Sequence, residues 1–137
     1  MEIGEKELEL SNKFYQITEQ VPVKVYDEGD YLYFLVEDKD KALSRLKLLE
    51  TAFKKRIIIY QDSDDLEQFL KNFFNNVKIH HYEVEQIGKE KHLLLFVDGK
   101  DAKKLYGKGK SRFNVAKKIL KEKFNMDLHV RKVPSLG

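Results

Sequence analysis

The apolar residues of this chain alternate between helical and strand spacing, and they do so in one order that occurs twice. In the first pass, Leu10, Phe14 and Ile17 are spaced as on one face of a helix. The predicted elements of this pass are a helix over 5–20, strands over 21–25 and 31–36, a helix with apolar residues between 43 and 53, and a strand over 56–60. Strands and helices mixed in this way predict an α+β fold with a small sheet packed on helices.

The second pass begins with the clearest helical stripe of the chain. Its apolar members are Leu66, Phe69, Leu70, Phe73 and Phe74, with Ser63 or Asp64 as the predicted N-cap. The elements predicted after it are strands over 77–86 and 91–97 joined by a turn, a short helix over 100–105, a helix over 111–124 and a strand over 127–133. The residues expected to face inward from the last helix are Phe113, Ala116, Ile119, Leu120 and Phe124.

The repeated order predicts two units, over 1–61 and 62–133, followed by a flexible tail over 134–137. The first unit is predicted as α-β-β-α-β and the second as α-β-β-α-α-β. The difference is a short helix and a glycine-containing loop, which the pattern shows in the second unit alone.

Composition excludes several classes of protein. The chain has no cysteine, so disulfides, thiolate catalysis and cysteine-ligated zinc are excluded. No apolar run approaches the roughly 20 residues that a membrane helix needs, and the acidic start is unlike a signal peptide. These features predict a cytoplasmic protein with no membrane partner.

Positive charge is concentrated in one segment. The net charge is only +3, yet 98–124 holds ten Lys or Arg against three acidic residues, while 1–30 is acidic. Such a local excess of positive charge produces a local electrostatic potential that the net charge of the chain does not reveal. A solvated lysine-rich helix face would produce the same excess.

The sequence gives little support for a catalytic site, a metal site or a nucleotide-binding site. His80 and His81 are adjacent on a predicted strand and point to opposite faces, so they are interpreted, with His92 and His129, as exposed or cross-strand histidines. No nucleophile stands beside a base, so the sequence predicts no enzyme, no cofactor and no metal. A nucleotide-binding P-loop is disfavoured, because Lys104 stands where its first glycine belongs.

The stretch YGKGKSRF, over 106–113, lies between two predicted helices and joins small residues to positive charge. A strand, a short helix, a glycine-lysine loop and a longer helix, after a helix and a hairpin, resemble a KH domain of the type II order. Two such units in one short chain resemble the archaeal NusA-like transcription termination and antitermination factors. The residues that carry the resemblance are 62–69, 72–79 and 105–116.

The resemblance implies a GXXG loop that clamps the backbone of about four nucleotides of single-stranded RNA. By position the loop is Gly107, Lys108, Gly109 and Lys110, with Lys110 where the second glycine belongs. A left-handed lysine there costs roughly 1–2 kcal/mol, which the chain avoids if Gly109 makes the turn. The other residues predicted to contact or attract phosphate are Arg112, Lys103, Lys104, Lys117 and Lys118.

In the first unit the corresponding loop position is predicted at 40–43, which holds no glycine. This unit is expected to keep a KH-like fold without the clamp. The resemblance thus implies a non-catalytic protein that binds nascent RNA in transcription, with RNA polymerase as a candidate partner. The alternative is an adaptor that docks on polymerase or the ribosome without clamping RNA. The tyrosines Tyr26, Tyr31, Tyr33 and Tyr60 fit either base stacking or strand packing.

Overall fold

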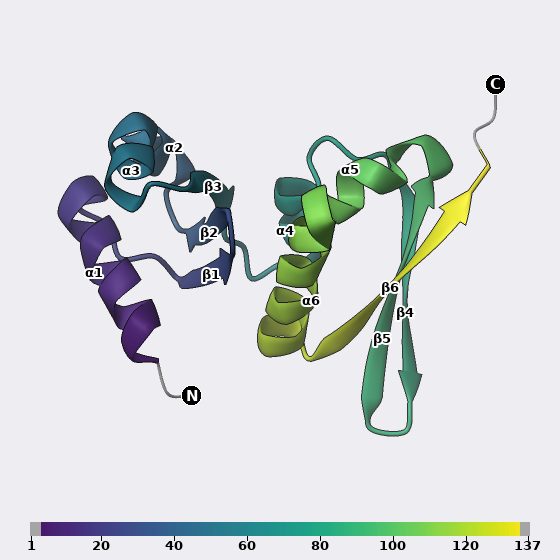
Figure 1. The fold of residues 1–137 in the computed structure, drawn as a ribbon. Helices are drawn as coiled ribbons and strands as arrows, with labels where there is room; N and C mark the ends of the chain where they lie inside the picture. The colour runs from purple at the N-terminus through teal and green to yellow at the C-terminus, as the bar shows by residue number, and fades with distance from the viewer. Residues whose placement is uncertain (1–3, 135–137) are drawn as a thin grey trace. The chain divides into compact units, whose positions relative to one another are not determined.

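The computed structural model describes residues 4–134 of the chain (Figure 1). Strands in this part form two three-stranded sheets, in the orders β1-β2-β3 and β4-β5-β6, and helices pack on both. In each sheet the first two strands are antiparallel and the last two are parallel. The α+β class with two small three-stranded sheets packed on helices is as predicted.

The first sheet is built by the first half of the chain. Its elements are α1 (Glu5–Thr18), β1 (Lys24–Glu28), β2 (Tyr31–Val36), α2 (Lys39–Leu43), α3 (Leu46–Phe53) and β3 (Arg56–Gln61). Alternate residues of β2 and β3 join Phe14 of α1 and Leu49 of α3 in a buried core. The rings of Phe14 and Phe34 stack at 4.3 Å, which fixes α1 on this face of the sheet.

The prediction that the first unit lacks a short helix is wrong. Helix α2 occupies Lys39–Leu43, so the proposed loop position at 40–43 lies inside a helix. The Oδ1 atom of Asp38 accepts a hydrogen bond from the Lys41 amide at 3.1 Å and caps the helix. Only Ala42 of this helix is buried, so no apolar period reveals it in the sequence. The order α-β-β-α-α-β therefore occurs twice.

Helix α4 (Leu66–Phe73) belongs to the first compact unit. The chain divides into Met1–Phe73 and Phe74–Gly137, whereas the sequence suggested a division at 61/62. The reason is that α4 packs on β3, where the rings of Tyr60 and Phe73 stack at 4.0 Å. Its N-cap is Asp65, whose Oδ2 accepts from the Gln68 amide at 2.9 Å.

Three of the four tyrosines considered for base stacking are buried. Tyr26, Tyr33 and Tyr60 are all less than a tenth exposed, and Tyr33 stacks on Tyr60 with ring centroids 6.1 Å apart. Strand packing is the role that the structure gives them.

The second unit holds the glycine-lysine loop. Its elements are β4 (Ile79–Ile87), β5 (Glu90–Asp98), α5 (Ala102–Tyr106), α6 (Ser111–Phe124) and β6 (Met126–Val133), with one turn of 3-10 helix at Gly99–Asp101 and another at Lys108–Lys110. Leu93, Leu95 and Val97 point from β5 into the core. Helix α6 buries Val115, Ala116, Ile119 and Leu120, while Phe113 and Phe124 are only half-buried.

Two predictions concern the ends and the surroundings of the chain. Except for Pro134, the predicted tail over 134–137 lies outside the described residues. Within residues 4–134, no helix combines the length and the apolar character needed to cross a membrane.

Candidate nucleic-acid interface

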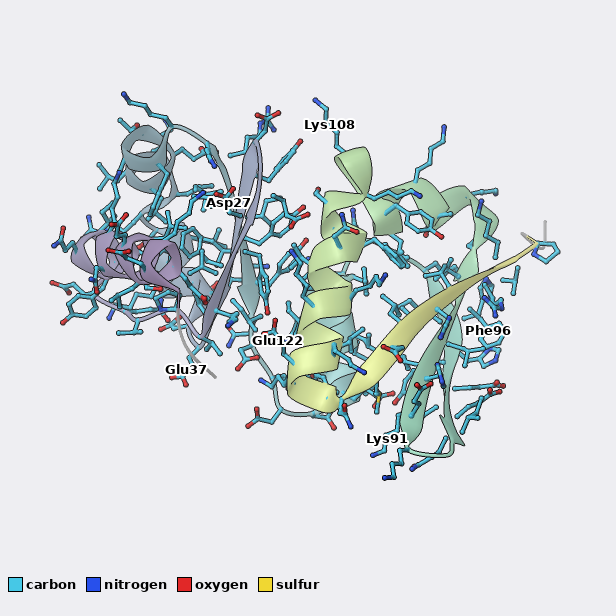
Figure 2. All side chains as sticks on the ribbon, turned by 60° about the horizontal axis from the view of Figure 1, so that its bottom comes forward. Asp27, Glu37, Lys91, Phe96, Lys108 and Glu122 are labelled. Carbon is cyan, nitrogen blue, oxygen red and sulfur yellow. The ribbon has the colours of Figure 1, made fainter. Side chains whose placement is uncertain are left out.

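The loop between α5 and α6 is short, exposed and cationic. Lys108, Gly109 and Lys110 are all exposed, and Gly107 is half-buried. Figure 2 shows the Lys108 side chain projecting outward from this loop. The amide of Lys110 donates to the Gly107 carbonyl at 3.1 Å and closes the turn. The loop thus presents positive charge at the start of α6.

Gly107 is required by packing. Its backbone has φ 74° and ψ 175°, a region that only glycine adopts readily. A Cβ atom placed on it would lie 2.8 Å from the Cβ of Arg112, which is too close for two carbon atoms. This glycine lets the start of α6 approach the end of α5.

Gly109 and Lys110 both adopt the left-handed conformation, with φ 62° at each. The expectation that Gly109 alone makes the turn is therefore wrong, because this bend needs two successive left-handed residues. No atom lies within 4 Å of a Cβ placed on Gly109, so its freedom is needed for backbone conformation alone. Lys110 carries the conformational cost of roughly 1–2 kcal/mol.

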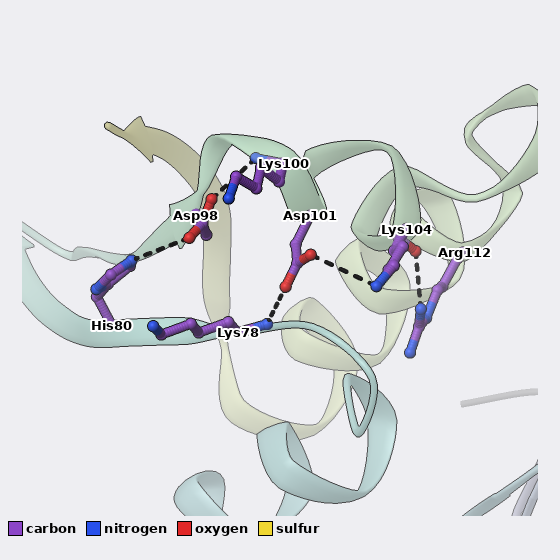
Figure 3. A network of polar contacts seen from close by, with 7 residues as sticks. All are labelled: Lys78, His80, Asp98, Lys100, Asp101, Lys104 and Arg112. Carbon is purple, nitrogen blue, oxygen red and sulfur yellow. Dashed lines mark hydrogen bonds and ion pairs between the residues drawn. The ribbon is translucent and has the colours of Figure 1, made fainter. Parts of the chain in front are cut away.

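Arg112 does not lie where the resemblance suggested. It is only 8% exposed, and its Nη1 donates to the Lys104 carbonyl at 2.7 Å (Figure 3). Its guanidinium also lies over the Phe74 ring at 5.3 Å. Arg112 therefore ties the first turn of α6 to α5, and a phosphate outside the loop does not reach a side chain so placed.

The remaining cationic residues of the predicted site are all exposed. These are Lys103, Lys104, Lys108, Lys110, Lys117 and Lys118. Lys104 forms an ion pair with Asp101 at 3.5 Å, and the other carboxylate oxygen of Asp101 accepts from the Lys78 amide at 2.7 Å (Figure 3). Asp101 thus fixes the start of α5 and partly neutralises one lysine of the set.

Helix α6 extends the exposed polar surface beyond the predicted residues. Counting in helical steps of three and four from Lys110 leads to Asn114, Lys117 or Lys118, and Lys121, all of which are exposed. Asn114 and Lys121 were not singled out from the sequence, although the i, i+4 spacing was a usable signal. The first turn of α6 contains no acidic residue, and its N-cap makes no side-chain hydrogen bond. A helix start of this kind favours a nearby anion.

An aromatic pair borders the loop. The rings of Tyr106, at the end of α5, and Phe113, in the first turn of α6, lie 5.0 Å apart at 57°. Both residues are half-buried. The ammonium group of Lys117 lies 5.6 Å from the centre of the Phe113 ring. The loop is thus flanked by ring surface as well as by charge.

The corresponding junction of the first unit, between α2 and α3, consists of Ser44 and Arg45. It has no glycine, and the Ser44 Oγ donates to the Lys41 carbonyl at 2.7 Å. Next to it lies an open cleft of about 670 Å³, whose lining includes Arg45 and Leu48. This junction has no loop in which a backbone could approach a phosphate closely.

Comparison with known proteins supports the fold. No protein-family model matches the chain, and no curated protein matches it. A solved structure, titled "Crystal structure of APE1850", is similar with a TM-score of 0.76 and 28% sequence identity. The match covers 94% of this chain and 100% of that one, so the two-sheet α+β architecture is shared over nearly its full length.

Proposed function

We propose that this protein binds single-stranded RNA without catalysing a reaction, through the α5–α6 loop of its second unit. We further propose that it is a NusA-like factor with tandem KH-like units, acting in the cytoplasm on nascent RNA in transcription elongation or termination. RNA polymerase is the candidate protein partner in this role.

The observation that carries the proposal is the conformation and exposure of 107–110. Three of these four residues have positive φ, and Lys108, Gly109 and Lys110 are exposed at the start of α6. A phosphate beside such a turn meets backbone N–H groups, the positive end of a helix dipole and two ammonium groups together. A backbone turn of this kind binds the phosphate groups of a nucleic acid, and it does not distinguish one base from another.

The wider surface favours a strand over an isolated phosphate. Lys103 and Lys104 lie on one side of the loop, and Lys117 and Lys118 continue along α6 on the other. Alternating charge and half-exposed rings, as in Tyr106 and Phe113, are typical of sites that bind unpaired nucleotides. Single-stranded RNA exposes both its phosphates and its base faces to such a surface.

The test is fluorescence anisotropy of a short single-stranded RNA titrated with the full chain at several salt concentrations. With about four phosphates contacted, log K falls against log salt with a slope near −3, from about −0.7 per phosphate. The variant K108D/K110D loses binding, because two attractions become repulsions. The matched control K89D/K91D reverses two exposed lysines at the β4–β5 turn and keeps the affinity within about threefold.

Two outcomes contradict the proposal. One is an affinity for RNA that K108D/K110D leaves unchanged while circular dichroism shows the fold intact. The other is an equal loss in both double variants, because that result assigns binding to net charge instead of to the loop.

A second candidate function is the adaptor, and the first unit favours it. The α2–α3 junction has no clamp, and Leu43 and Leu48 on these helices are 39% and 55% exposed. Such apolar exposure beside an open cleft suits a protein partner. A pulldown that retains RNA polymerase after nuclease treatment, and that is lost in Leu48→Lys but kept in K108D/K110D, favours the adaptor.

A further inference from the structure

A cluster of imidazoles and carboxylates lies on the second sheet, away from the α5–α6 loop. It occupies the face of β5 and β6 opposite to the core, because His92 and Leu94 alternate with the buried Leu93 and Leu95. Register pairs His92 with Asp127 and Leu94 with His129 on the parallel strand β6. Glu90 precedes His92 by two residues on the same face. Two neighbouring strands therefore hold four side chains of metal-binding types on one face, and Glu90, His92 and Asp127 are the three whose donor atoms lie close to one another.

The donor atoms of this cluster converge. One ligand atom from each of Glu90, His92 and Asp127 lies within 4.8 Å of the other two. His92 Nε2 lies 3.4 Å from Glu90 Oε2. Zinc binds such nitrogen and oxygen atoms at about 2.0–2.2 Å, so a small contraction brings all three within reach of one ion. The half-exposed Asp127 and the exposed Glu90 have room to make this adjustment.

His129 provides the support that a metal-binding histidine requires. Its Nε2 lies 2.9 Å from His92 Nδ1, and the His92 side chain is only 18% exposed. These two ring nitrogens are at hydrogen-bond distance, so one imidazole donates to the other. With a cation on His92 Nε2, His92 Nδ1–H donates to His129 Nε2. The outer ring accepts this hydrogen bond and orients the ligand.

The geometry points to a divalent transition-metal site, with His92 Nε2, Glu90 and Asp127 as ligands of an ion such as Zn²⁺ and His129 as a positioning residue. One imidazole with two carboxylates suits Zn²⁺ better than Mg²⁺, which prefers oxygen ligands and retains its waters. Three protein ligands leave a position open for water. The Lys121 ammonium lies 3.5 Å from Asp127 and competes with the ion for that carboxylate. This inference is independent of the proposed RNA binding.

The experiment is isothermal titration of the full chain with Zn²⁺ alone, in a buffer that does not bind metals, with Mg²⁺ titrated in parallel. We expect one Zn²⁺ per chain and no heat from Mg²⁺ at the same concentrations. NMR of the labelled protein locates the ion, and we expect the largest amide shifts at Glu90, His92 and Asp127. This mapping uses the unaltered chain and does not depend on any variant folding.

The variants then assign the roles. His92→Gln and Glu90→Gln weaken Zn²⁺ binding at least tenfold, and His129→Phe weakens it about tenfold through loss of orientation. Lys121→Gln strengthens binding a few-fold by freeing Asp127. Two matched controls on the same sheet, His80→Gln and Glu83→Gln, leave the affinity unchanged.

Several results overturn the site. They are an absence of Zn²⁺ heat and NMR shifts in the unaltered chain, shifts centred on His80 and His81, and an affinity that a folded His92→Gln variant retains.

Discussion

The α2–α3 and α5–α6 junctions stand at the same place in the repeated order of elements, yet they are built differently. In the first, Ser44 and Arg45 join the helices without a glycine. In the second, three residues with positive φ make a bend whose outer side is open and cationic. The comparison teaches that one order of elements accommodates either a plain connection or an exposed backbone turn. The second junction differs from the first by its two glycines, Gly107 and Gly109, and by the buried Arg112.

The largest expected effect comes from Gly107→Ala. The added Cβ would lie 2.8 Å from Arg112 Cβ, in a backbone region that favours glycine, so we expect a loss of about 3 kcal/mol in stability. Urea denaturation followed by circular dichroism measures it. Gly109→Ala is the matched control, and it costs about 1 kcal/mol because its surroundings are open. Equal losses in the two variants would refute the packing role of Gly107.

Arg112→Met is expected to have the next largest effect. It removes the hydrogen bond to the Lys104 carbonyl but keeps a long apolar side chain, so unfolding becomes easier by about 1–2 kcal/mol. The corresponding change in the first junction, Arg45→Met, is nearly neutral, because Arg45 is exposed. RNA affinity, measured well below the melting temperature, stays the same in Arg112→Met. A large loss of RNA affinity in folded Arg112→Met would contradict this expectation and would indicate that Arg112 contacts phosphate.

Lys110→Gly is expected to stabilise the protein by about 1 kcal/mol, since glycine adopts the left-handed conformation without cost. The change also removes one positive charge from the loop, so RNA affinity falls modestly and the salt slope becomes shallower by about 0.7. Lys54→Gly, at a left-handed residue that ends α3, serves as its counterpart in the first unit. We expect Lys54→Gly to raise the stability of the protein by a similar amount and to leave its affinity for RNA unchanged. Thermal melts and anisotropy titrations of both variants test this pair of expectations.

The smallest effect concerns an ion-pair group in the first unit. Burial raises the pKa of Asp27, but hydrogen bonds from Lys6 and Lys55 lower it more, so this pKa lies below its ordinary value. Asp27 therefore contributes stability above its unfolded pKa, and this contribution is lost as pH falls through the lower folded pKa. Asp27→Asn should cost at most about 1 kcal/mol near neutral pH and progressively less as the pH falls through the folded-state pKa of Asp27. Urea midpoints across this range measure the difference, and a constant difference would contradict the assignment.

Much of the fold could be predicted because apolar spacing marks it. The stripe from Leu66 to Phe73 and the run over 31–36 became α4 and β2 at nearly the predicted bounds. Helix α2 was not predicted because Ala42 is the one buried residue among its five, so the helix shows no apolar period in the sequence. The unit boundary moved because the stacking of Tyr60 on Phe73 joins residues through tertiary contact, which spacing along the chain does not reveal.

The site was predictable in its charges and less so in its geometry. The six lysines are exposed, as the proposed electrostatic contact with RNA would require. In the sequence, Arg112 is one more positive charge in the same segment as these lysines. Its hydrogen bond to the Lys104 carbonyl shows that its side chain faces inward. The left-handed conformation of Lys110 likewise depends on the packing of α5 against α6, which the sequence pattern does not reveal. The cluster around His92 depends on the register of β5 with β6, which the sequence does not fix.

The steric demand at Gly107 separates what can change in this loop from what cannot. The bend is held from inside by Gly107 and Arg112, while a side chain on Gly109 would meet no neighbour. A change at 108–110 therefore meets no packing limit at Gly109, although 109 and 110 keep the conformational preference of left-handed residues. In a library randomised at 108–110, with Gly107 and Arg112 kept, we expect the folded members to be enriched in glycine and asparagine at 109 and 110 and unrestricted at 108.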